Sequence, residues 1–208
     1  MRAHAVFARL YGKFAPAAEK AGTSAHRDEL LADLMGRVIE VGAGSGLCFS
    51  HYPTSATEVV AIEPQPHLRH LAEQAAKGAP VPVRVIDGVA EKLPADDESF
   101  DAAVVSLVLC SVPDQHRALV EVHRVLRRSG QLRFYEHVRS EDPGQAKLQD
   151  RVDWVWPYLG GGCHANRATG AAIVEAGFRI ERCRRFDFRP CAILAPVSPH
   201  IIGEAIRL

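Results

Sequence analysis

Short runs of apolar residues alternate with longer amphipathic segments through the middle of the chain. The apolar runs are rich in Val and Ile, whereas the segments between them repeat their apolar positions with helical spacing. Strands are expected at residues 38–41, 58–62, 81–86, 102–109 and 131–138, with helices at 66–77 and 113–127. This alternation favours a parallel sheet whose strands are connected by helices.

The C-terminal part of the chain departs from that simple repetition. Helices are expected at 145–156 and 167–176, and two further strands at 178–187 and 200–206. These last strands would close one edge of the sheet. Because no internal repeat or low-complexity linker divides the sequence, residues 1–208 are predicted to form a single α/β domain.

The N-terminal segment is amphipathic. Its apolar residues recur at helical spacing, at Val6, Phe7, Leu10, Tyr11 and Phe14, and a second helix is expected at 24–35. Basic residues interrupt the apolar positions, so the segment lacks the continuous apolar stretch of a secretory signal. With one basic and one apolar face, this segment could also touch a membrane surface.

Composition and charge exclude several classes of protein. The 208 residues are 47% hydrophobic, which is enough for one sizeable core, and 25 basic residues balance 25 acidic residues. With no overall positive field, binding of nucleic acid by bulk charge is not expected. The apolar run 102–112 is shorter than the roughly 20 residues that cross a bilayer. The 5 cysteines have no C-x-x-C spacing, so a reducing, cytoplasmic location is expected.

A glycine-rich loop follows the first predicted strand of the sheet. Gly42, Gly44 and Gly46 come directly after Glu40 and Val41, where glycines permit a positive φ and let backbone N–H groups approach a ligand. The spacing is G-x-G-x-G rather than the G-x-G-x-x-G of dinucleotide-binding proteins, which favours a different cofactor. Glu63 ends the next strand, where a carboxylate can accept both hydroxyls of a ribose.

These features resemble the class I S-adenosylmethionine (SAM)-dependent methyltransferases, and the likeness extends over nearly everything from residue 38 onward. The resemblance implies a doubly wound, Rossmann-like sheet of seven strands, mainly parallel, with one antiparallel edge strand. It also implies that residues 1–35 form lid helices over the cofactor. A lid is therefore favoured over a membrane contact for this segment.

The resemblance assigns cofactor-binding roles to several residues. The three glycines would approach the methionine part of SAM, with Glu40 near its amino end, and Glu63, followed by Pro64, would hold the ribose. Val89, Ala90 and Glu91 would lie near the adenine, and Leu107 would pack under its ring. Relatives often carry Asp at the position of Val89, so Asp87 or backbone groups could replace that side chain.

A narrower resemblance lies in short strings along the chain. They are His51-Tyr52-Pro53, residues 62–66, residues 107–112, Glu136-His137-Val138, Gly162-Cys163 and residues 199–203. In this order they are similar to the methyltransferase-like alkyl thiol S-methyltransferases. This likeness implies a small-molecule acceptor, with a thiol as the candidate by family analogy. An O- or N-methyltransferase of a lipid, quinone or natural product is the alternative, and a non-catalytic SAM-binding subunit is another.

His137 is the candidate catalytic base. A thiol or phenol acceptor must lose its proton before it attacks, and histidine has a suitable pKa. His137 is predicted at the carboxyl end of a strand, the edge where open α/β folds bind ligands. The alternative is that it only satisfies hydrogen bonds at the strand end. Glu136 could orient its imidazole or point to the other face.

Residues 140–166 are expected to form an acceptor-binding insertion. The resemblance places such an insertion between two strands, and this segment holds both tryptophans. Trp154, Trp156, Cys163 and His164, together with Tyr11 of the lid, are the candidate acceptor-binding residues. The alternative is an aromatic helix face packed on the sheet. Cys163-His164 has no second ligand pair in the sequence, so no metal site is predicted.

Overall fold

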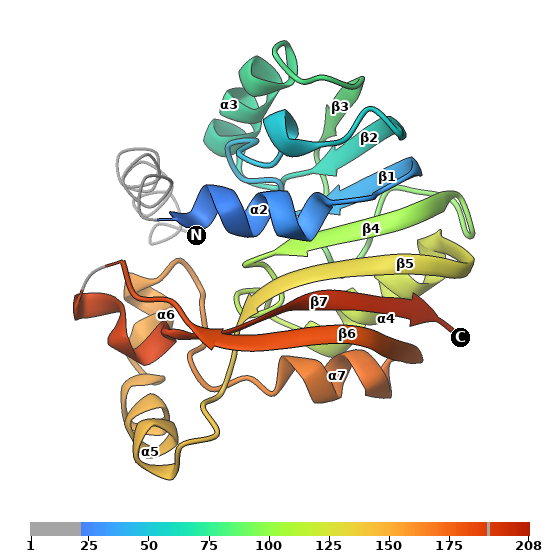
Figure 1. Ribbon diagram of the computed structural model, residues 1–208. Helices are drawn as coiled ribbons and strands as arrows, with labels where there is room; N and C mark the ends of the chain where they lie inside the picture. Colours follow the sequence, from blue (N-terminus) through green and yellow to red (C-terminus); the bar gives the residue numbers. More distant parts are fainter. Residues whose placement is uncertain (1–21, 191) are drawn as a thin grey trace.

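A computed structural model describes residues 22–190 and 192–208 (Figure 1). It contains a seven-stranded sheet in the order β3-β2-β1-β4-β5-β7-β6. The strands are β1 (Gly36–Val41), β2 (Ala56–Ile62), β3 (Val83–Ile86), β4 (Phe100–Ser106), β5 (Leu126–His137), β6 (Phe178–Asp187) and β7 (Pro199–Arg207). The predicted seven-stranded α/β fold is confirmed.

The sheet is parallel except for β7. β1 pairs in parallel with β2 and β4, and β4 pairs in parallel with β5. β7 pairs antiparallel with both β5 and β6, so the antiparallel strand lies next to the edge strand β6. Its arrow points opposite to those of the other strands in Figure 1. The carboxyl ends of β1, β2, β4 and β5 consequently meet at one edge of the sheet.

Helices cover both faces of the sheet, because the central strands are apolar on both sides. They are α2 (Ser24–Leu31), α3 (Pro66–Ala76), α4 (Gln115–Val125), α5 (Pro143–Val152), α6 (Trp156–Leu159) and α7 (Thr169–Glu175), with the 3₁₀ helices η2 (Phe49–His51) and η3 (Ala192–Val197). Neighbouring residues of β1 point to opposite faces: Val38 packs in a cluster with Leu31 of α2, and Ile39 in a cluster with Leu119 of α4.

Several helix starts are fixed by local hydrogen bonds. The side chain of Gln65 accepts the N–H of Leu68 at the start of α3, and Asp114 caps α4 through Arg117. Asp142 caps α5, in which Pro143 takes the first position. These caps set the positions of helices that follow the carboxyl ends of β2, β4 and β5.

Some boundaries differ from the sequence-based expectations. β4 ends at Ser106 rather than at residue 109, because Leu107 takes a positive φ of 59° that leaves the strand conformation. α2 ends at Leu31 and α5 at Val152, each earlier than expected, and the second tryptophan begins the separate helix α6. β5 begins at Leu126, inside the segment expected to be helical.

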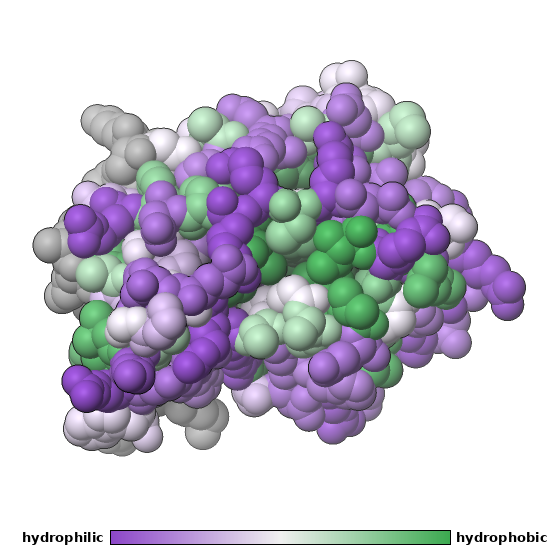
Figure 2. All heavy atoms as spheres, turned by 60° about the horizontal axis from the view of Figure 1, so that its bottom comes forward, coloured by the Kyte–Doolittle hydropathy of each residue, from purple (hydrophilic) through white to green (hydrophobic). Residues whose placement is uncertain are grey.

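The expected first helix and Tyr11 lie outside the described residues, so the lid over residues 1–35 stays a prediction. Within the described residues, no helix is both long and apolar enough to cross a membrane. Figure 2 shows the face that forms the bottom of Figure 1, where hydrophilic residues cover most of the surface and hydrophobic ones gather in patches between them.

Candidate functional site

The glycine loop begins where β1 ends. Gly42, Gly44 and Gly46 have φ values of 72°, 58° and 81°, the left-handed region that favours glycine. A Cβ on Gly42 would lie 2.5 Å from Val108, and one on Gly46 would lie 2.7 Å from Phe49. A Cβ on Gly44 would meet no atom of residues 22–190 or 192–208 within 4 Å. Packing therefore requires the first and third glycines, whereas the part of the chain that the structure describes leaves space at the middle glycine where a ligand can approach.

Glu63 connects this loop to the end of β2. Its carboxylate accepts the backbone N–H of Gly44 at 2.8 Å and that of Gln65 at 2.9 Å, and only 5% of the residue is exposed. Burial raises the pKa of Glu63, while the two N–H donors and Arg69 act in the opposite direction. The carboxylate predicted to hold a ribose thus lies directly beside the glycine loop.

Glu40 lies beneath the loop in β1 and is almost completely buried. Its carboxylate accepts a hydrogen bond from the hydroxyl of Tyr52 at 2.8 Å. Burial raises the pKa of Glu40 to about 7, although hydrogen bonds from Tyr52 and Cys48 and the charge of Arg27 act to lower it. A carboxyl group that can change its charge near neutral pH is therefore placed under the glycine loop.

The segment after β3 was predicted to frame the adenine. Arg69 joins it to the ribose-side acid: its guanidinium donates to the carbonyl oxygens of Glu63 and Pro64 and to the carboxylate of Asp87, at 2.9, 3.2 and 2.9 Å. Val89 is 45% exposed and Ala90 is buried. The carboxylate of Glu91 accepts the N–H of Asp114 at 3.3 Å.

Glu91 is thus held at the start of α4. Val89, where relatives often carry Asp, offers an apolar surface there instead of a carboxylate. Asp87, the substitute considered from the sequence, is bound to Arg69.

Leu107 lies at the turn after β4, and its N–H donates to the carbonyl of Tyr135 in β5 at 2.7 Å. A side chain at φ 59° costs about 1–3 kcal/mol, and such residues cluster at functional sites. Leu107 is half-buried at the carboxyl edge of the sheet. Its place between β1 and β5 is compatible with the predicted packing under the adenine.

Glu136 fixes the loop that follows Leu107. Its buried carboxylate accepts three consecutive backbone N–H groups, from Val108, Leu109 and Cys110, at 2.9, 2.9 and 3.0 Å. Its hydrogen bonds go to this loop, and neighbouring residues of a strand point to opposite faces, so of the two roles considered from the sequence the structure favours the one in which Glu136 points to the other face. Burial raises the pKa of Glu136, while the three N–H donors lower it. Glu136 positions this loop.

His137 lies half-buried at the end of β5 and faces two thiols. Its Nδ1 is 3.5 Å from Sγ of Cys110 and 3.4 Å from Sγ of Cys163. Burial alone lowers the pKa of His137, but the Cys163 sulfur and the Glu136 carboxylate outweigh it and the pKa is raised. Cys110 was not singled out from the sequence, because residues 110, 137 and 163 are too far apart in the chain to form a visible motif.

The expected acceptor-binding residues are divided between solvent and this cluster. Trp154 is 77% exposed, whereas Trp156 packs against the apolar cluster that contains Cys110 and Cys163. Nδ1 of His164 lies 2.8 Å from a carboxylate oxygen of Asp153. Figure 1 shows α5 and α6 on the left, the side toward which the arrowheads of the parallel strands point. Residues 140–166 therefore lie at the same edge as the glycine loop.

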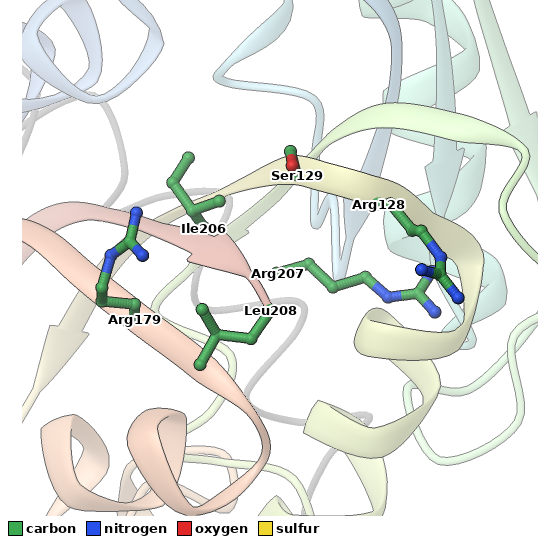
Figure 3. A pocket seen from close by; sticks show the side chains of 6 residues that line it. All are labelled: Arg128, Ser129, Arg179, Ile206, Arg207 and Leu208. Carbon is green, nitrogen blue, oxygen red and sulfur yellow. The ribbon is translucent and has the colours of Figure 1, made fainter.

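A surface cavity of about 400 Å³ lies at the opposite edge of the sheet. Figure 3 shows its lining: Arg128, Ser129, Arg179, Ile206, Arg207 and Leu208. These residues belong to the amino-terminal parts of β5 and β6 and to the end of antiparallel β7 and the residue after it. In open α/β sheets ligands bind at the carboxyl ends of the parallel strands, so this cavity is separate from the candidate site.

Comparison with known proteins agrees with this geometry. A family model described as a methyltransferase domain matches residues 39–134, which hold the glycine loop, Glu63 and Leu107. Thiol S-methyltransferase TMT1B of Rattus norvegicus is 34% identical over 175 residues, covering 82% of this chain and 70% of that protein. Thiol S-methyltransferase TMT1A of Homo sapiens is 34% identical over 179 residues, with the same coverage.

Solved structures support the fold. A SAM-dependent methyltransferase from Thermotoga maritima superposes with a TM-score of 0.72 at 19% identity, covering 100% of this chain and 99% of that one. Geranyl diphosphate methyltransferase in complex with SAM has a TM-score of 0.69 at 11% identity, covering 90% of this chain and 85% of that one. With the glycine loop, the buried acid at the end of β2 and the curated relatives, these findings show that the chain belongs to the class I SAM-dependent methyltransferases and is related to the thiol S-methyltransferases TMT1A and TMT1B.

Proposed function

We propose that the protein transfers the methyl group of SAM to a small-molecule thiol. The observation that carries this proposal is the imidazole of His137 at the carboxyl end of β5, among the sulfur atoms of Cys110 and Cys163. It lies at the sheet edge that also bears the glycine loop. The curated relatives named thiol S-methyltransferases support the same acceptor class.

The residues at the glycine loop fit the cofactor. The unfilled space at Gly44 lets the methionine part of SAM approach the backbone, and Gly42 and Gly46 hold the loop in shape. Glu63 would hold the ribose with the carboxylate that already binds the loop, and Glu40 would lie near the amino end. Bound there, SAM supplies an electrophilic methyl group on a sulfonium.

The adenine would lie between two segments at the carboxyl edge. Val89 and Ala90 offer an exposed apolar side chain and a buried one, and Glu91 is held in place by Asp114. Leu107 would pack under the ring from the turn after β4, and Pro64 directs the chain from Glu63 into α3.

His137 is the proposed catalytic residue, on which deprotonation of the acceptor depends. Methyl transfer from a sulfonium is an in-line displacement, so holding the nucleophile near the methyl carbon in a dry pocket supplies much of the catalysis. A thiolate is the stronger nucleophile, and the acceptor thiol must therefore lose its proton. The imidazole of His137, whose pKa is raised by the neighbouring Cys163 sulfur, is suited to receive it.

Residues 140–166 are the proposed acceptor-binding segment. Cys163 contacts His137 from this segment, and Trp156 packs against the apolar cluster that contains Cys163. Such an apolar wall would exclude water and favour an apolar thiol. Trp154 and His164 would contact the acceptor farther from the reacting sulfur, and Tyr11 would contribute from the N-terminal segment.

A panel of acceptors tests the proposal. The purified protein is given SAM with an alkyl thiol, a catechol or an amine, and methylated product is measured for each. We expect turnover with the thiol and at least about 10-fold less with the catechol and the amine. Turnover only with the catechol or the amine contradicts the thiol acceptor. SAM binding without turnover on any acceptor indicates a non-catalytic SAM-binding subunit and also contradicts the proposal.

A further inference from the structure

Three potential metal ligands lie close together at the carboxyl end of β5. Sγ of Cys110, Nδ1 of His137 and Sγ of Cys163 all lie within 4.8 Å of one another. They come from the loop after β4, the end of β5 and the turn after α6. Both cysteines are buried, and the imidazole is half-buried. Two cysteine thiols and one histidine imidazole together form a ligand set that is found in zinc sites.

The distances match zinc coordination. Zn–S bonds of about 2.3 Å and Zn–N bonds of about 2.0–2.1 Å at tetrahedral angles place the N and S ligand atoms about 3.6 Å apart. The observed N–S distances are 3.5 Å to Cys110 and 3.4 Å to Cys163. Small side-chain movements are therefore enough for all three atoms to share one ion.

Hydrogen bonds outside the cluster hold its backbone in place. The Glu136 carboxylate fixes the loop that ends at Cys110, and the carbonyl oxygen of Cys110 accepts the N–H of His164 at 2.7 Å. Asp153 holds the turn after Cys163 by accepting the N–H of Ala165 at 2.8 Å. A metal site requires such supporting contacts, because they set the ligand geometry before the ion binds.

Charge favours a divalent cation here. The apolar neighbours of the two thiols include Ala165, Val197 and Trp156, so an unbalanced thiolate would be costly in these surroundings. Two thiolates, a neutral imidazole and Zn²⁺ have no net formal charge. Imidazole and thiolate ligands suit zinc, whereas magnesium and calcium prefer oxygen.

We propose that Cys110, His137 and Cys163 bind one Zn²⁺ ion and leave its fourth coordination position for the sulfur of the acceptor. The second part rests on the proposed thiol acceptor, whereas the metal site does not. When the acceptor thiol coordinates the ion, its S–H bond breaks, the electron pair stays on sulfur and the proton leaves to solvent. In this arrangement Nδ1 of His137 is a metal ligand rather than the base that receives the acceptor proton.

The metal site is tested by zinc binding, without SAM or acceptor. The full chain is reduced, freed of metal with a chelator and titrated with Zn²⁺, and Co²⁺ is used as a spectroscopic probe. We expect one equivalent of tightly bound Zn²⁺ and a thiolate-to-Co²⁺ charge-transfer band. Cys110→Ser and Cys163→Ser should each weaken binding by more than the roughly 10–100-fold that follows loss of a supporting contact.

Cys183→Ser is the matched control, because Cys183 is an exposed thiol in β6 outside the cluster. It should bind zinc as the unchanged protein does. If Cys110→Ser and Cys163→Ser fold and bind zinc with the same affinity as the unchanged protein, the proposed site is overturned. A count of five reactive thiols in the denatured protein, equal to the 5 cysteines of the chain, confirms that Cys110 and Cys163 are reduced. Recovery of these two only as a disulfide after reduction also overturns the site.

The role of the ion is tested separately with the thiol acceptor. Removal of zinc should lower thiol methylation at least about 10-fold, and one equivalent of Zn²⁺ should restore it, while the Kd for SAM is unchanged. Thiol turnover that is equal with and without bound zinc overturns the coordination of the acceptor. Absence of thiol turnover in the zinc-loaded enzyme, with turnover on another acceptor, instead contradicts the proposed function.

Discussion

Gly44 donates its backbone N–H to the carboxylate of Glu63 at 2.8 Å. This hydrogen bond joins the glycine loop after β1 to the acid at the end of β2. The same carboxylate also accepts the N–H of Gln65, so its position is set from both sides. Two sequence features recognised independently therefore form one preorganised surface at the carboxyl edge of the sheet.

Removal of the Glu63 carboxylate should weaken SAM binding. Glu63→Ala loses the charged acceptor proposed for the ribose hydroxyls, which is worth about 1–3 kcal/mol, or roughly 5–150-fold in Kd. Calorimetric titration with SAM measures this change. Glu58→Gln is the control, because Glu58 lies in β2, the strand that Glu63 follows, and pairs with Arg37 instead. An unchanged Kd in Glu63→Ala contradicts the assignment.

Substitutions at two glycines of the loop should affect different quantities, one mainly the affinity for SAM and the other mainly the free energy of unfolding. Gly44→Ala has room for its methyl group and should cost only about 1–2 kcal/mol of stability for its positive φ. Its SAM affinity should nevertheless fall at least about 10-fold, because the methyl group enters the space proposed for the cofactor. Gly42→Ala overlaps Val108 and should lose about 1–3 kcal/mol more stability.

Thermal unfolding and SAM titration on both glycine variants check this prediction. Full SAM affinity in a folded Gly44→Ala protein would mean that the cofactor does not approach the loop at its middle glycine.

Glu40 should make stability depend on pH. Burial raises its pKa from 4.5 to about 7, so the folded state holds a proton that the unfolded state has lost. The stabilisation is complete below about pH 4.5 and is lost as the pH rises to about 7. Its full extent is about 3 kcal/mol. Glu40→Gln keeps an acceptor for Tyr52 and should lack this component.

Denaturant unfolding of the cofactor-free protein at several pH values measures the effect. The stability of the unchanged protein should fall relative to Glu40→Gln between pH 4.5 and 7.5. Parallel stability curves for the two proteins would show that Glu40 is ionised throughout this range.

His137→Ala should lower methyl transfer to a thiol by roughly 10²–10⁴-fold, because the acceptor would no longer be deprotonated at the site. The Kd for SAM should be unchanged, since His137 lies outside the residues proposed to hold the cofactor. His70→Ala is a control on an exposed histidine of α3. A His137→Ala enzyme with full turnover at all pH values would leave proximity alone as the source of catalysis.

Much of the region proposed to bind SAM could be predicted from local sequence. Strand β6 has the expected bounds, and the glycine loop occurs where its spacing predicted, because both depend on residues that are neighbours in the chain. The end of β4 was placed too late, since the apolar pattern continues through Leu107 although its φ is positive. Hydrophobicity does not report that change of backbone conformation.

The region proposed to bind the acceptor, around His137, could be predicted only in part. His137 was identified from its place after a strand, but its two sulfur neighbours come from distant segments that only the folded chain brings together. Two of the three N–H groups bound by Glu136, those of Val108 and Leu109, belong to residues that were expected to be strand. Long-range hydrogen bonds of this kind leave no periodic signal in the sequence.

Methyl transfer from SAM to an alkyl thiol is the measurement that tests the central claim most directly. Calorimetry with SAM and with S-adenosylhomocysteine on the same sample first establishes that the cofactor site is occupied. The account predicts binding of both compounds and formation of the methyl thioether at a rate that depends on His137. Failure to bind either compound, or binding with no thioether formed, would contradict it.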